Sequence, residues 1–139
     1  MEGDRVMTVI LKQLRAGYGC EMALYRHVRE LARRQAQLLH RGAQANGLAL
    51  LRLSAEKERL LENIGAIDGS LAPSRAVLAR EKDFIMDGAL DGLNEVLDDL
   101  YEVIEEIRGL ELESYSLVAP RNKAERRPAV SIAAAASLN

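Results

Sequence analysis

Apolar residues recur at alternating steps of three and four along two long stretches of the chain. This spacing places them on one side of an α-helix, because residues three and four apart are neighbours on a helix surface. The first stretch comprises Leu50, Leu53, Lys57, Leu60, Ile64, Ile67 and Leu71, and the second comprises Leu90, Leu93, Leu97, Leu100, Ile104 and Ile107. Such a seam has to be covered by a partner helix. We therefore expect long helices that pack along their length.

The composition also favours an all-α fold. The chain has 139 residues, with one Phe, four Tyr, no Trp and three prolines. No alternating apolar run flanked by hairpin turn residues predicts a strand. We expect one domain, built as an elongated antiparallel helical hairpin plus a third long helix, in the manner of a three-helix bundle or coiled coil.

Turn-forming residues divide the chain into three expected helices. The stretches 41–47 and 68–74 each contain glycine, and Pro73 in the second suits the first turn of a new helix. The glycine-rich stretch 87–92 is expected to interrupt or bend the third helix, and beyond Leu117 the apolar pattern stops. The expected helices cover about 5–40, 48–68 and 73–117 within a domain 1–118, followed by a flexible tail at 119–139.

The distribution of charge limits the classes of partner. Residues 83–113 contain eleven acidic side chains and a single basic one, whereas residues 1–82 contain fourteen basic and nine acidic ones. The acidic block argues against nucleic acid, since phosphate binding needs Lys and Arg concentrated on one surface. No window of about 18 apolar residues predicts a membrane span. Cys20 is the only cysteine, so the chain cannot form an internal disulfide, which suits a reducing cytosol.

The sequence offers no constellation of residues for catalysis. His27 and Glu30 lie one turn apart, but a carboxylate-bridged di-iron bundle needs Glu-x-x-His pairs on two helices. The neighbouring acids Asp98 and Asp99 point about 100° apart on a helix and do not form an acid–base pair. We therefore predict no catalytic residue, no cofactor and no metal, and a protein that is not an enzyme.

Lys57 interrupts the apolar seam of the second expected helix. One interpretation is structural, because a single polar seam residue fixes the register of packed helices and its stem can lie along apolar neighbours. The other interpretation gives the ammonium an acidic partner, either on the third helix or on a bound protein. Both remain open from the sequence.

The same region resembles the flagellar export chaperones of the FlgN-like family. The stretch NGLALLRLSAEKERLLENIGAID has the leucine-rich segment, the Glu-Lys pair and the Leu-Leu pair in an order typical of that family, and the resemblance extends more weakly over about Thr8 to Val118. The matching residues are Leu50, Leu53, Glu56, Lys57, Leu60, Leu61, Ile64 and Ile67.

This resemblance implies a chaperone in the bacterial cytoplasm that has no catalytic residues. Such chaperones bind the helical C-terminal region of hook–filament junction proteins, prevent their premature assembly and deliver them to the flagellar type III export apparatus. An amphipathic client helix can lie in a groove between apolar helices, anchored at helical spacing. A structural coiled-coil adapter or oligomerisation protein without a client is the alternative. The apolar rows also allow a homodimer.

A second apolar row suggests where a client helix would bind. Val96, Val103, Leu110 and Leu117 follow one another at seven-residue intervals and continue after the main seam fails at Glu111. An apolar row that outlasts the seam is a candidate recognition surface. The alternative is that this row packs against the first helix. The predicted client-binding residues are Val96, Tyr101, Val103, Leu110, Tyr115 and Leu117.

Overall fold

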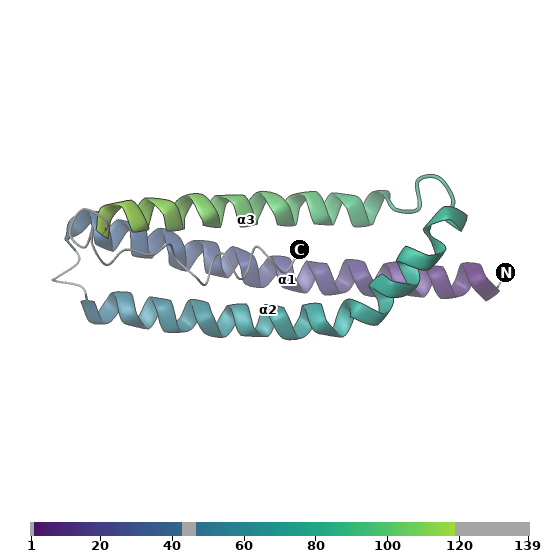
Figure 1. The fold of residues 1–139 in the computed structure, drawn as a ribbon, viewed down its shortest axis with the longest axis horizontal. Coiled ribbons are helices and arrows are strands. Elements are labelled where there is room, and N and C mark those ends of the chain that lie inside the picture. The colour runs from purple at the N-terminus through teal and green to yellow at the C-terminus, as the bar shows by residue number, and fades with distance from the viewer. Residues whose placement is uncertain (1, 43–46, 119–139) are drawn as a thin grey trace.

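The protein folds as three long helices, as the apolar seams predict (Figure 1). The structure, a computed structural model, describes residues 2–42 and 47–118, with side chains from Arg5 onward. Its elements are α1 (Glu2–Arg41), α2 (Gly47–Glu81), the short 3₁₀ helix η2 (Lys82–Phe84) and α3 (Asp91–Val118). The described residues contain no strand, so the all-α prediction is confirmed. The expected tail at 119–139 lies outside the described residues.

The helix α1 is the centre of the fold. In Figure 1, α2 runs antiparallel to α1, and α3 runs in the same direction as α1. Both α2 and α3 pack along α1, whereas their own backbones approach each other closely at few points. Side chains rather than close backbone packing therefore fill most of the space between α2 and α3.

The core follows the predicted seams. Leu14, Val28 and Leu31 of α1 and Ile64 of α2 are fully buried. Burying such a side chain contributes about 1.5–3 kcal/mol. The predicted seam residues that are buried are Lys57, Leu60, Ile64 and Leu71 of α2 and Leu93, Leu100, Ile104 and Ile107 of α3.

The predicted break at 68–74 is wrong, and so are the helices expected at 48–68 and 73–117. The helix α2 continues through Pro73 as far as Glu81. The lost N–H and the ring of a proline bend a helix without ending it where tertiary contacts hold both sides. Figure 1 shows the resulting change of direction, after which the end of α2 crosses α1.

The packing of Leu71 explains why α2 continues through the predicted break. This seam residue is buried, and it packs so closely on Gly17 of α1 that a Cβ there would lie 2.5 Å from Leu71 Cδ2. The contact holds α2 against α1 two residues before the proline. The chain leaves the helix only at 82–90, where Gly88 adopts a φ of +83° that favours glycine.

None of the described helices is both long enough and apolar enough to cross a membrane.

Candidate functional site

The predicted client-binding row does not form a free surface. Val103 is 5% exposed, and Val96, Leu110, Leu117 and Tyr115 are half-buried. Only Tyr101 among the six predicted residues is largely exposed, at 52%. The expectation that this row lies outside the fold is therefore wrong at Val103.

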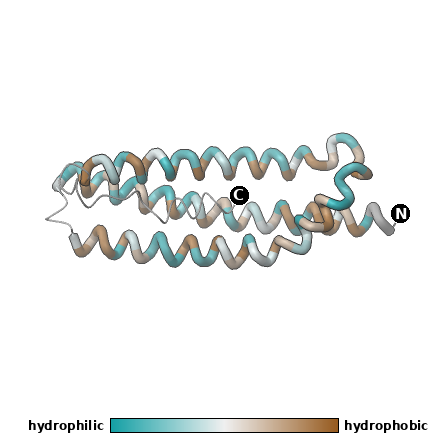
Figure 2. Tube along the Cα trace, viewed as in Figure 1, coloured by the Kyte–Doolittle hydropathy of each residue, from teal (hydrophilic) through white to brown (hydrophobic). Residues whose placement is uncertain are grey.

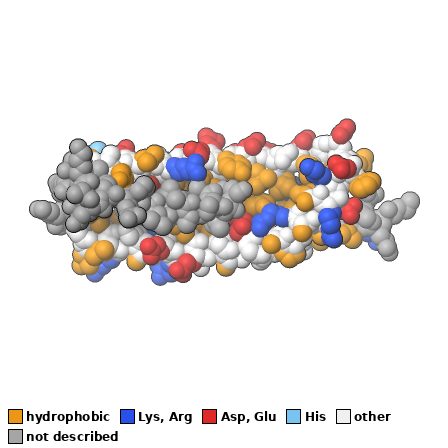
Figure 3. Space-filling model, in the orientation of Figure 1, with side chains coloured by type: hydrophobic (Ala, Val, Ile, Leu, Met, Phe, Trp, Pro, Cys, Tyr) orange, Lys and Arg blue, Asp and Glu red, His pale blue; other side chains and the backbone are white. Residues whose placement is uncertain are grey.

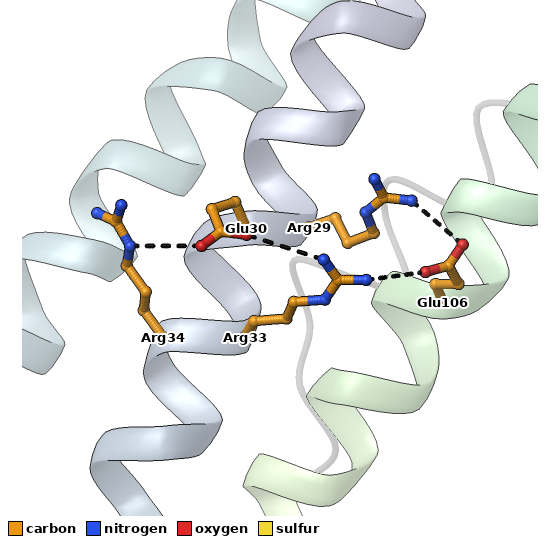
Figure 4. Close-up of polar contacts among 5 residues, drawn as sticks. All are labelled: Arg29, Glu30, Arg33, Arg34 and Glu106. Carbon is orange, nitrogen blue, oxygen red and sulfur yellow. Dashed lines mark hydrogen bonds and ion pairs between the residues drawn. The ribbon is translucent and has the colours of Figure 1, made fainter.

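Ion pairs near Val103 show that this side of α3 faces α1. Three residues beyond it, Glu106 accepts hydrogen bonds from Arg29 at 3.2 Å and from Arg33 at 3.3 Å, both on α1 (Figure 4). Farther along α3, Glu113 lies 3.3 Å from His40 of α1. This side of α3 therefore faces α1, in agreement with the alternative that the row packs against the first helix.

Lys57 has an acidic partner on α3, which agrees with the interpretation that its ammonium pairs with an acid of the third helix. The side chain is buried, and its Nζ donates a hydrogen bond to Glu111 of α3. Glu111 occupies the position at which the α3 seam fails, so the two seam irregularities face each other. Nearby, Gln35 of α1 donates to Ser54 of α2 at 2.8 Å. These polar contacts line one end of a pocket of about 390 Å³ where the three helices meet.

Replacing Lys57 tests the contribution of this pair. Lys57→Ala is expected to lower the free energy of unfolding by about 3 kcal/mol, because it leaves the Glu111 carboxylate largely enclosed and without its cation. The double variant Lys57→Met/Glu111→Leu removes both charges and is expected to remain within about 1 kcal/mol of the parent. Urea unfolding of the variants and the parent measures both values. A single variant as stable as the parent would contradict the assignment.

A second polar cluster lies inside the bundle, between α1 and α2. Glu21 is 3% exposed, and its Oε2 has no hydrogen-bond partner. Burial raises the pKa of Glu21 to about 7, with further contributions from the charge of Asp68 and a hydrogen bond to it. Arg75 partly offsets this shift, and it donates to Asp68 at 3.0 Å and to Tyr18 at 3.3 Å. Glu21 therefore holds its proton up to about neutral pH.

Sequence reasoning missed this cluster, although a signal was present. Glu21 falls between Tyr18 and Tyr25 at steps of three and four, so it occupies an apolar position of α1 in the way that Lys57 does on α2. A carboxyl group with a pKa of about 7, such as Glu21, has the chemistry of an acid–base group at neutral pH. Here the enclosing side chains keep a substrate away, because Glu21 is almost wholly covered. The cluster is structural.

The two most exposed large apolar residues follow the end of α2, which crosses α1. Phe84 is 81% exposed and Met86 is 79% exposed. With the beginning of α1 they enclose a pocket of about 500 Å³. Figure 2 shows hydrophobic residues on both crossing segments. The apolar end, as we name this surface, comprises Val6, Leu11, Val77, Phe84, Ile85 and Met86.

The apolar end was not predicted from the sequence. Its one local signal is the triplet Phe84-Ile85-Met86, which stands in a charged context and includes the only Phe of the chain. The contribution of Val6 and Leu11 depends on how far α2 extends beyond Pro73. Contiguous exposed apolar surface on a folded protein is typical of a site for another protein.

The described residues contain no group of three or more His, Cys, Asp or Glu side chains placed to hold a metal ion. His27, considered above as a ligand, lies 3.5 Å from Glu56 of α2, and both side chains are substantially exposed.

Comparisons with protein-family models, with curated proteins and with solved structures found no match to this chain.

Proposed function

We propose that the protein is a flagellar type III export chaperone that binds the helical C-terminal region of hook–filament junction proteins in the bacterial cytoplasm. In this proposal it prevents their premature assembly and delivers them to the export apparatus. The observation that carries the proposal is the apolar end, which exposes Phe84 and Met86 to solvent. The resemblance of residues 46–68 to the FlgN-like family supplies the class of client.

The apolar end suits an amphipathic helix as its ligand. Such helices bind by placing apolar side chains, spaced at three and four residues, into an apolar depression. The pocket of about 500 Å³ has the size to receive one or two such side chains. Phe84 and Met86 would cover the client helix, and the flexible thioether of Met adapts to clients of different shape.

The limited size of this surface agrees with an escort role. A chaperone has to release its client at the export apparatus, and small interfaces are typical of transient complexes. While bound, the apolar face of the client helix is covered and unable to pack in a filament. Client contacts at the other predicted residues, Val96, Tyr101, Leu110, Tyr115 and Leu117, stay predictions. No client contact is proposed for the buried Val103.

A thermal-shift measurement tests the proposed function. A synthetic peptide covering the C-terminal helix of a hook–filament junction protein is expected to raise the melting temperature by about 9 °C at a concentration a hundredfold above Kd, because a ligand of the native state stabilises it by mass action. The control is the same peptide with its apolar positions replaced by Ser, which is expected to leave the melting temperature unchanged. A structural adapter would be indifferent to both peptides, and that result would contradict the proposal.

A further inference from the structure

Two exposed surfaces of opposite charge lie on different sides of the bundle. The first is a groove of about 320 Å³ between α1 and α2. Arginines and apolar side chains line it. The basic groove, as we name it, comprises the exposed Arg34, Arg41 and Arg52 and the partly buried Leu38, Ala49 and Leu53. Gln37 and one acid, Glu56, complete its lining, and the Glu56 carboxylate lies 3.5 Å from His27.

The arginines of the basic groove are available to a partner. Arg41 and Arg52 form no ion pair with any residue in the described ranges, and both are exposed. Arg34 has only a 3.7 Å contact with Glu30, its neighbour one turn away. In Figure 4, Arg34 extends away from α3, on the opposite side of α1 from the contacts of Glu106. An acidic partner would approach this side without disturbing the bundle.

The second surface is an acidic strip on the outer side of α3. It comprises Glu95, Asp98, Glu102 and Glu105, which are exposed and spaced by three, four and three residues. Figure 3 shows acidic groups along the outer edge of the molecule where α3 lies. Within the described part of the chain, Glu105 is the only one of the four with an ion pair, to Arg108 at 2.7 Å. The exposed ring of Tyr101 stands beside the strip.

The two surfaces match in spacing as well as in charge. Arg34 and Arg41 are seven residues apart on α1, which corresponds to about 10.5 Å along the helix. Glu95 and Glu102 are also seven residues apart on α3, as are Asp98 and Glu105, so they repeat at the same distance of about 10.5 Å. If α3 lies along the groove, its acidic residues therefore recur at the same spacing as the arginines of the groove.

We propose that α3 of a second copy of this chain lies in the basic groove, with its acidic strip against the arginines and Tyr101 against the apolar side chains of the groove. Tyr and Arg are enriched among the residues that dominate protein interfaces. Because the groove and the strip lie on different sides of one copy, the contact is head-to-tail rather than two-fold symmetric. The association is weak and sensitive to salt, since exposed charges are screened within about 10 Å at 0.1 M salt.

Sedimentation equilibrium of the full-length protein tests this contact. The parent is expected to associate reversibly, with a Kd at least about tenfold lower in about 20 mM than in about 200 mM NaCl. Arg41→Glu/Arg52→Glu and Glu95→Lys/Glu102→Lys are each expected to weaken the association at least about tenfold, since like charges would then face each other. Mixing the two variants restores complementary surfaces and is expected to restore association.

The matched control is Arg26→Glu/Arg80→Glu, which makes the same change in net charge at exposed arginines outside the groove. It is expected to associate like the parent. The proposal is overturned if the parent is monomeric at both salt concentrations, if the control weakens association as much as the groove variant, or if the mixture stays monomeric. None of these readouts requires a client, so they are independent of the proposed chaperone function.

Discussion

Val103→Asp is expected to unfold the protein or to lower its free energy of unfolding by about 4 kcal/mol or more. The side chain is 5% exposed on α3, and its removal forfeits about 1.5–3 kcal/mol of apolar burial. The new carboxylate would also lose its hydration without gaining a cation, since Arg29 and Arg33 already bind Glu106. Circular dichroism during heating measures the loss. The change is a large part of the 5–15 kcal/mol by which domains of this kind are stable.

Tyr101→Asp is the matched control on the same helix. Tyr101 is two residues away and 52% exposed, so the same carboxylate at this position remains hydrated. We expect this variant to stay within about 0.5–1 kcal/mol of the parent. Equal stability of the two variants would show that Val103 is not in the core. The comparison also means that a loss of client binding in Val103→Asp would report unfolding rather than a lost contact.

The stability of the parent is expected to fall as the pH rises from about 5 to about 8, and Glu21→Gln is expected to remove most of this decline. The pKa of Glu21 is raised from 4.5 to about 7 in the folded protein, chiefly by burial and then by Asp68. A raised carboxyl pKa stabilises the folded state fully below the unfolded pKa, and this contribution is lost as the pH rises through about 7. A neutral amide at this position cannot ionise, so the stability of the Gln variant lacks this dependence on pH.

Urea unfolding at pH 5.5 and pH 8 measures the effect. At pH 8 the Gln variant is expected to be more stable than the parent by about 2 kcal/mol, because the parent then holds the ionised carboxylate of Glu21 in the interior. Glu62→Gln, at an exposed position of α2, is the control and is expected to leave the difference between the two pH values as in the parent. A parent whose stability is constant or rises over this range would contradict the raised pKa of Glu21.

The helical seams were predictable because one periodicity governs them. Leu60, Ile64, Leu100 and Ile107 are buried, as their spacing requires. The end of α2 was not predictable by local rules, since the sequence Asp68–Ser74 has the composition of a turn. A tertiary contact between Leu71 and Gly17 outweighs that local preference and carries the helix through Pro73.

The candidate site was less predictable than the fold, for a related reason. An apolar row on one helix does not reveal whether another helix of the chain covers it, and α1 covers Val103. The apolar end consists of residues from the first turns of α1 and of residues from the end of α2, from η2 and from the loop after it, about seventy residues later in the sequence. Their proximity follows from the crossing of α2 over α1, and that crossing depends on the course of α2 beyond Pro73.

The affinity of the client helix for two surface variants tests the central claim most directly. Phe84→Asp/Met86→Asp changes two exposed residues of the apolar end, and Leu112→Asp changes an exposed leucine of α3 far from it in the fold. Isothermal titration with the C-terminal helical peptide of a hook–filament junction protein is expected to show Kd raised at least about tenfold in the double variant and unchanged in Leu112→Asp. A folded Phe84→Asp/Met86→Asp variant that binds the peptide as tightly as the parent would contradict the assignment of the apolar end as the client site.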